Sequence, residues 1–357
     1  MTSDKKKSSE VKKILGYIIP VLLTLFFLYL TFKDVDLGKV LEIIADSSLI
    51  WFVIFILSFY ISHIIRAFRW KVMLRSTKKD TSLLYLLGAI MIGYGVNSFV
   101  PRLGEFYRGM FAGRWENISR SSVLGTIVVE RVIDILILGV SVLASVIIYP
   151  GSLYNDVFWL KSALYFGFLG ILLIIVVIIL LVKFKHKFYD WIIKLVGRFS
   201  EKIAKKLSYI FEMLINGFAT IKGFQNYLWV IILSAAMMLS YGLSSYLGFF
   251  VLNFNSSYEV SFGMAWVVMT ISAFGVIIPT PGGTGSYHFI VKSVLVGLFA
   301  FTQEAGSAYA LLTHTVSIIV FVVSMFGFIA YINNYRAKLG FPKENFFSVI
   351  KGETTGI

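Results

Sequence analysis

The chain has 357 residues, of which 58% are hydrophobic and only 15% are charged, and it carries a formal net charge of +14. Soluble domains carry about 25% charged residues, so this composition excludes an ordinary soluble protein and predicts an all-α, polytopic transmembrane bundle. The positive charge is better explained by membrane topology than by nucleic-acid binding. The absence of cysteine excludes disulfides and thiolate chemistry.

In chain order, apolar runs of about the 20 residues needed to cross a bilayer lie at 14–32, 48–65, 121–149, 157–182, 227–252 and 306–332. The first run is too long for the core of a signal peptide and no small-residue cleavage site follows it, so it is predicted to be a retained span. Two further blocks, 83–115 and 262–301, are apolar but interrupted by Pro and Gly.

Lys and Arg are distributed unevenly between the apolar runs. Of the 33 Lys and Arg residues, 28 lie in five segments: 1–13, 66–82, 102–120, 183–226 and 333–357. The positive-inside rule assigns these segments, and with them both termini, to the cytoplasm. Both ends of the first interrupted block then lie inside, and both ends of the second lie outside. Each block is therefore predicted to be a re-entrant helical hairpin; the alternative is a pair of full but kinked spans.

The predicted fold has about six full spans plus two re-entrant hairpins. Hairpins that enter from opposite faces are typical of inverted-repeat transporters. The domain boundaries follow: a basic cytoplasmic tail at 1–13, one transmembrane domain at 14–335, and a cytoplasmic tail at 336–357. In segment 183–226 apolar residues recur every three or four positions with Lys and Arg between them, which predicts interfacial helices on the cytoplasmic leaflet. It is either a connector with some affinity for anionic lipid or a specific regulatory site.

The first interruption runs from Asn97 to Arg108 and includes Pro101. Broken helix survives at membrane depth only where protein or water surrounds it. If the part after the break is helical, Glu105 lies three residues from both Arg102 and Arg108. Two guanidinium groups suit a phosphate, which they grip in bidentate fashion. The alternative is an interfacial ion pair that ends the hairpin.

A second group of charges, Glu130, Arg131 and Asp134, lies inside the apolar run 121–149. Each ionisable group near the middle of a span costs at least about 2.5–3.5 kcal/mol, so these side chains are predicted to face the interior. Arg131 and Asp134 are spaced to pair. The group is either a proton relay or head-group site, or a structural ion network.

The second interruption contains Gly282, Gly283 and Gly285 and ends at His288. Consecutive amides before a helix N-terminus form an anion-binding nest; the alternative is a tight turn that needs glycine for close packing. His288 and His314 are candidates for proton coupling. No spacing of histidines suggests a metal site, and neither a metal nor a cofactor is predicted.

Three ordered motifs together resemble the lysylphosphatidylglycerol synthase transmembrane (flippase-like) family of prokaryotic membrane proteins. They are Asn97-x3-Pro101-Arg102-x-Gly104-Glu105-x2-Arg108, Glu130-Arg131-x2-Asp134 and Pro281-Gly282-Gly283-x-Gly285. The resemblance covers about residues 14–335, includes Arg66-x2-Arg69-Trp70, and implies a location in the plasma membrane. The family often has a glutamate where this chain has His288 and an arginine near His314. The identity of the lipid head group therefore does not follow from the resemblance. The resemblance does not imply aminoacyl transfer.

The residues and the resemblance together predict a flippase-like protein that binds and translocates an anionic phospholipid or a polyprenyl-phosphate-linked lipid. Arg102 and Arg108 would hold the phosphate, and the amides of 282–285 would line the far side. Asn97 and His288 would complete the binding site. Glu105, Glu130 and Asp134 would either couple transport to protons or orient the binding residues. One alternative is a non-catalytic membrane partner of a glycosyltransferase or lipid-modifying enzyme. Another is an intramembrane enzyme that acts on a lipid phosphate through Glu105 or His288.

Overall fold

The fold is taken from a computed structural model of the chain. It describes residues 18–149 and 223–351 and, between them, 151, 165, 169, 170, 172, 173, 176, 193–198, 200–205, 207, 208, 211 and 221. The predicted tail 1–13 and most of the predicted span 157–182 and of segment 183–226 lie outside the described residues.

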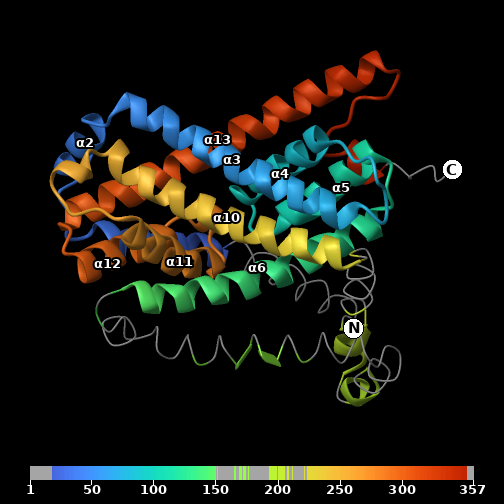
Figure 1. Cartoon of the computed structure of the whole chain (residues 1–357), viewed down its shortest axis with the longest axis horizontal. Helices are drawn as coiled ribbons and strands as arrows, with labels where there is room; N and C mark the ends of the chain where they lie inside the picture. Colours follow the sequence, from blue (N-terminus) through green and yellow to red (C-terminus); the bar gives the residue numbers. More distant parts are fainter. Residues whose placement is uncertain are drawn as a thin grey trace, which may run out of the picture. The chain divides into compact units, whose positions relative to one another are not determined.

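The elements of the described part are helices, as the composition predicts (Figure 1). A helix over Ile18–Phe32 comes first. It is followed by α2 (Leu37–Ala45), α3 (Leu49–Leu74), α4 (Leu83–Asn97), α5 (Leu103–Glu116), α6 (Arg120–Ile148), α10 (Phe224–Val251), η1 (Phe254–Ser256), α11 (Phe262–Ile277), η2 (Pro281–Gly283), α12 (Ser286–Phe299), α13 (Gln303–Lys338) and α14 (Ser348–Lys351).

Within the described residues, four helices are long and apolar enough to cross a membrane: α3, α6, α10 and α13. The pair formed by the Ile18–Phe32 helix and α2 passes the same test but is bent by 86°. The bend follows Phe32, and α2 starts anew because the Asp36 carboxylate accepts hydrogen bonds from the amides of Gly38 and Lys39. These helices confirm a polytopic helical membrane protein, while the number of six full spans stays a prediction.

The chain divides into two compact units, which are described separately. Unit 1 comprises the described residues of Met1–Tyr60 together with Tyr94–Gly104 and Ser240–Phe326. Unit 2 comprises Ile61–Gly93, the described residues of Glu105–Leu239, and those of Gly327–Ile357. Helices α3, α4, α10 and α13 each contribute residues to both units.

Both interrupted blocks are helical hairpins broken at the Pro/Gly motifs. In unit 1, α11 and α12 pack against each other. In unit 2, the ring of Tyr85 near the start of α4 lies 6.1 Å from that of Trp115 near the end of α5. The amide of Ser82 also donates to the Glu116 carboxylate over 2.6 Å. The predicted positions of the breaks are therefore correct, and re-entry into the membrane stays a prediction.

Contacts inside unit 2 join the segments that the charge distribution assigns to the cytoplasm. The Lys78 amine donates to the Glu116 carboxylate over 2.8 Å. The Arg114 guanidinium donates to the Glu344 carboxylate over 2.9 Å. Segments before α4, at the end of α5 and after α13 thus lie together, as a common membrane side requires.

Contacts inside unit 1 join predicted outer segments in the same way. The side-chain amide of Asn253 donates to the carbonyl of Asp46 over 2.8 Å. The ring of Tyr258 stacks on that of Phe301 with 3.9 Å between centroids. The loop after α10 therefore contacts both the loop after α2 and the loop after α12.

Candidate functional site

A buried group of ion pairs lies in unit 2, and we call it the arginine cluster. Its members are Arg66 and Arg69 of α3, Arg108 of α5, and Glu130 and Asp134 of α6. The three arginine side chains are at most 4% exposed, Glu130 is 1% exposed and Asp134 is 16% exposed.

The two carboxylates bridge the arginines in a regular pattern. Glu130 Oε1 accepts from Arg66 Nε over 2.7 Å and from Arg69 Nη2 over 3.1 Å. The Asp134 oxygens each accept one bond of 2.5 Å, one from Arg66 and one from Arg69. Glu130 Oε2 accepts from Arg108 Nη2 over 2.7 Å. Glu130 is therefore the residue that joins all three arginines.

Helix periodicity explains why these side chains converge. Arg66 and Arg69 are three residues apart on α3, and Glu130 and Asp134 are four apart on α6, so each pair occupies one face of its helix. A hydrogen bond between uncharged side chains joins the same two helix faces: Trp70 Nε1 donates to Thr126 Oγ1 over 2.9 Å. Thr126 precedes Glu130 by one turn. The sequence prediction that Glu130 and Asp134 face the interior is confirmed.

Arg108 differs from the other two arginines in its surroundings. Its guanidinium carbon lies 3.8 Å from the centroid of the Trp70 ring, a cation–π contact. Glu130 is the carboxylate with which it forms a salt bridge in the described part of the chain, whereas Arg66 and Arg69 each contact both Glu130 and Asp134. Its Nε, like that of Arg69, is buried and has no hydrogen-bond partner among the described residues, so the number of carboxylates is what sets Arg108 apart.

The charges of the arginine cluster do not balance. Among the described residues, three arginines face two carboxylates, which leaves one positive charge in excess. At its edge Arg131 pairs with Glu105 and lies 3.7 Å from Asp134, with the Arg131 and Glu105 side chains 41% and 27% exposed. This edge pair is neutral, so the excess remains. An uncompensated buried charge costs several kcal/mol, and a bound anion would neutralise it.

The predicted Arg102–Glu105–Arg108 face is only partly observed. Arg102 precedes α5, is exposed, and has a φ of 67°, so it does not share a helical face with Glu105; that expectation is wrong. The reason is that the helix begins one residue later, at Leu103. Glu105 pairs with Arg131 on α6. Asn97 accepts a hydrogen bond from the amide of Gly104 over 2.7 Å and so bridges the break.

The second motif forms a polar group in unit 1 around the glycine turn. Gly282, Gly283 and Gly285 have φ values of 59°, 79° and 86°, a region that glycine enters without steric cost. The amides of Gly283 and Thr284 donate to carbonyls within the turn, and the Gly285 amide donates to His288 Nδ1 over 3.2 Å. These three amides are therefore occupied inside the protein, as the tight-turn interpretation requires.

Two histidines complete this group. His314 Nε2 lies 2.9 Å from the Gly282 carbonyl oxygen. The His288 and His314 rings are 4.6 Å apart between centroids and meet edge to face. Both side chains are buried. The structure thus brings the predicted histidines and glycines together.

The tips of the two hairpins also meet within unit 1. A Cβ added at Gly282 would lie 3.3 Å from the Cα of Ser98, which follows α4. At Gly285 an added Cβ would lie 2.7 Å from the Thr24 carbonyl oxygen, closer than real Cβ atoms come. Glycine is needed at Gly285 for both space and backbone conformation.

Arg66, Arg69 and Trp70 are site residues that the charge distribution does not reveal. Their segment, 66–82, is predicted to be cytoplasmic, but α3 continues to Leu74 and buries all three side chains. The signal was present in their spacing, since two arginines three residues apart followed by tryptophan prolong the helical pattern of the preceding run.

Helices able to cross a bilayer, two broken hairpins and a buried cluster of ionised side chains define a polytopic membrane protein with a polar interior. The chain belongs to the lysylphosphatidylglycerol synthase TM region family, whose model matches residues 17–324. It is also 23% identical over 332 residues to a UPF0104 membrane protein of Methanocaldococcus jannaschii, an alignment that covers 89% of this chain and 95% of the relative. No solved structure matches the chain.

Proposed function

We propose that this protein binds the phosphate of an anionic membrane lipid at the arginine cluster and translocates that lipid across the plasma membrane. The lipid is an anionic phospholipid or a polyprenyl-phosphate-linked lipid. The observation that carries the proposal is the single positive charge in excess among the described side chains of the arginine cluster. A phosphate would supply the missing negative charge.

Arg108 is the arginine best suited to contact the lipid. Among the described residues, Arg66 and Arg69 each form salt bridges with two carboxylates, whereas Arg108 forms a salt bridge with Glu130 alone. A guanidinium presents its donors in a fixed fork that matches two oxygens of a phosphate. The Trp70 ring packs against the guanidinium, whose carbon lies 3.8 Å from the ring centroid.

The translocation part of the proposal has separate support. Ionised side chains inside membrane segments usually mark a substrate or ion path. The two broken hairpins resemble the discontinuous helices that form binding sites in transporters. The family to which the chain belongs is named for a lipid synthase membrane region, and in this chain we infer a role for that region in lipid movement.

The test is lipid transport by the purified protein in proteoliposomes that contain a labelled anionic phospholipid. We expect transport by the wild type and its loss in Arg108→Gln. Arg75→Gln is the matched control, because Arg75 is exposed and bonds only to the exposed Asn226 side chain among described partners; it should transport normally. An Arg102→Gln variant shows whether the exposed arginine also contributes, as the sequence predicts.

Two results would change the proposal. Unaltered lipid binding and transport by a folded Arg108→Gln protein would contradict the phosphate-binding role. Lipid binding that depends on Arg108 without any transport by the wild type would instead favour the alternative in which the protein presents a lipid to a glycosyltransferase or lipid-modifying enzyme.

A further inference from the structure

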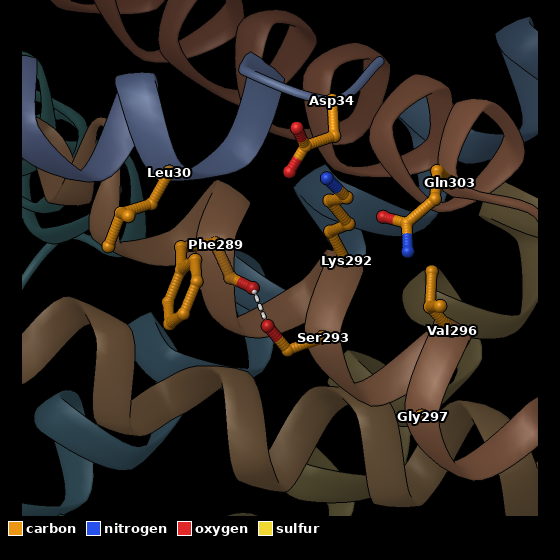
Figure 2. Close-up of a pocket in the computed structure, with 8 residues that line it drawn as sticks. All are labelled: Leu30, Asp34, Phe289, Lys292, Ser293, Val296, Gly297 and Gln303. Atoms are coloured by element: carbon orange, nitrogen blue, oxygen red, sulfur yellow. Dashed lines mark hydrogen bonds between the residues drawn. The ribbon is translucent and has the colours of Figure 1, made fainter.

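A separate pocket lies in unit 1 along one face of α12. Phe289, Lys292 and Val296 follow one another at helical spacing, and Leu30, Asp34 and Gln303 complete the lining from neighbouring segments (Figure 2). The cavity volume is about 290 Å³. Ligand pockets usually measure about 300–1,000 Å³, so this one has room for a head group rather than for a whole lipid.

Lys292 supplies a buried positive charge at this pocket. The residue is 7% exposed, and its amine donates one hydrogen bond of 2.5 Å to the carbonyl of Thr31. An ammonium has three donors. No carboxylate of a described residue lies within 4.0 Å of the amine, and Asp34 pairs instead with Lys33 at 3.6 Å. The ammonium therefore has donors left for an anionic ligand.

Acceptor groups surround the amine at the mouth of the pocket. Figure 2 shows the Lys292 amine between the carboxylate of Asp34 and the side-chain amide of Gln303. The Asp34 side chain is 74% exposed, so its carboxylate remains accessible to a ligand. A cation with an anion and an amide beside it suits a group that carries both phosphate and hydrogen-bond donors.

The remaining wall is apolar and partly open. Leu30, Phe289 and Val296 present carbon atoms to the cavity. A Cβ added at Gly297 would meet no atom within 4 Å, so the space beside this residue is empty of protein. An apolar, open wall beside a buried charge favours a ligand that continues into the bilayer over a free soluble anion.

We propose that this pocket is a second lipid site, which binds the phosphodiester head group of a phospholipid. Its phosphate contacts Lys292, and the hydroxyl or ammonium donors of its head group contact Asp34 and Gln303. The pocket belongs to unit 1 and the arginine cluster to unit 2, so this site does not depend on the proposed function. The charge distribution predicts that Asp34 and Gln303 face the outside, which makes it a site for the outer leaflet.

The experiment counts phospholipids bound to the purified full-length protein by native mass spectrometry. The probes are phosphatidylglycerol and phosphatidylethanolamine, which carry donors, and phosphatidylcholine, which has none. Gly297→Leu places a side chain in the pocket from a position where an added Cβ has open space, and Lys292→Gln removes the charge. Gly327→Leu and Lys39→Gln are the matched controls, since Gly327 also has open space around it and Lys39 is exposed.

We expect both pocket variants to bind one phosphatidylglycerol fewer than the wild type, or to bind it about tenfold more weakly, about 1.4 kcal/mol. Both controls should bind as the wild type does. Arg108→Gln should lose a different bound lipid, so that a double variant with Gly297→Leu loses both. This additivity separates failure of the second site from failure of the arginine cluster.

Wild-type binding by Gly297→Leu and Lys292→Gln would overturn the inference. Equal binding of phosphatidylcholine at this site would overturn the role of Asp34 and Gln303. Displacement of the lipid by an equal concentration of inorganic phosphate would show a free-anion site instead. Because the Cβ at position 297 has open space and leucine replaces a helical glycine, Gly297→Leu is expected to fold even if Lys292→Gln is unstable.

Discussion

The arginine cluster of unit 2 and the glycine turn of unit 1 are built in different ways. The arginine cluster consists of ionised side chains, each held by one or more opposite charges, and its described members leave one positive charge in excess. The glycine turn consists of neutral groups, where Ser286 Oγ donates to the Gly275 carbonyl over 2.7 Å and His314 bonds to Gly282. A neutral network can be satisfied internally, whereas an unbalanced group of charges requires a further ion. We therefore infer ligand binding from the first arrangement and hairpin stability from the second.

The units also differ in the predicted membrane side of their loops, which is outside for unit 1 and cytoplasmic for unit 2. Cysteine labelling gives an all-or-none test of that difference. The native chain has no cysteine, so single substitutions report cleanly. We expect a membrane-impermeant thiol reagent added to whole cells to label Ser257→Cys in unit 1 and not Lys79→Cys in unit 2. Both positions are exposed. Labelling of Lys79→Cys from outside would contradict the topology predicted from charge.

Removal of the central carboxylate should have the largest effect on stability. Glu130→Leu leaves Arg66, Arg69 and Arg108 short of a partner, and breaking a buried ion pair costs about 3–5 kcal/mol. We expect a large fall in the thermal unfolding temperature. Glu105→Gln is the comparison, because its pair with Arg131 is partly exposed and such pairs contribute about 0–1 kcal/mol. Equal shifts of the unfolding temperature in the two variants would show that the buried arginine cluster and the partly exposed Glu105–Arg131 pair contribute equally to stability.

A methyl group at Gly285 tests the hairpin of unit 1. Gly285→Ala places a Cβ 2.7 Å from the Thr24 carbonyl oxygen at a φ of 86°. Strained backbone of this kind costs about 1–3 kcal/mol, so the unfolding temperature should fall. Gly297→Ala meets no atom within 4 Å and lies in α12; it should leave that temperature unchanged or raise it. Similar behaviour of the two variants would mean that the turn is not required.

Arg108→Lys separates charge from geometry in the arginine cluster. The lysine keeps the positive charge but loses the planar fork and the stacking on Trp70. We expect normal expression and an affinity for anionic lipid that falls about tenfold, which corresponds to about 1.4 kcal/mol. Arg75→Lys should bind lipid normally. An unchanged affinity in Arg108→Lys would show that charge alone suffices.

The smallest effect is expected at His314. Glutamine can replace the hydrogen bond to the Gly282 carbonyl, so His314→Gln should preserve the unfolding temperature. If the glycine turn has a structural role, the dependence of transport on pH between about 5 and 8, where histidines titrate, should not change either. A flattened profile would instead support the proton coupling that the sequence suggests for this residue.

Local rules explain what could be predicted from the sequence. A bilayer demands long apolar helices with internally paired backbones, so composition alone indicates the class of protein. Pro101 and the glycines near Gly282 locate the two breaks, and the spacing of Glu130 and Asp134 places both on an inward face. The Arg131–Asp134 pair was predictable as well, because both residues lie on one helix.

The sequence determined which side chains share a helix face, and the tertiary structure decided what lies opposite each face. Residue spacing follows from the helical repeat, but contacts between helices depend on packing that no local pattern specifies. The sequence pattern therefore predicts Arg66 and Arg69 in a cytoplasmic loop, although α3 includes both and buries them against α6. Glu105 meets Arg131 on another helix instead of its neighbour Arg108 for the same reason, since an ion pair at membrane depth forms wherever packing brings an opposite charge closest.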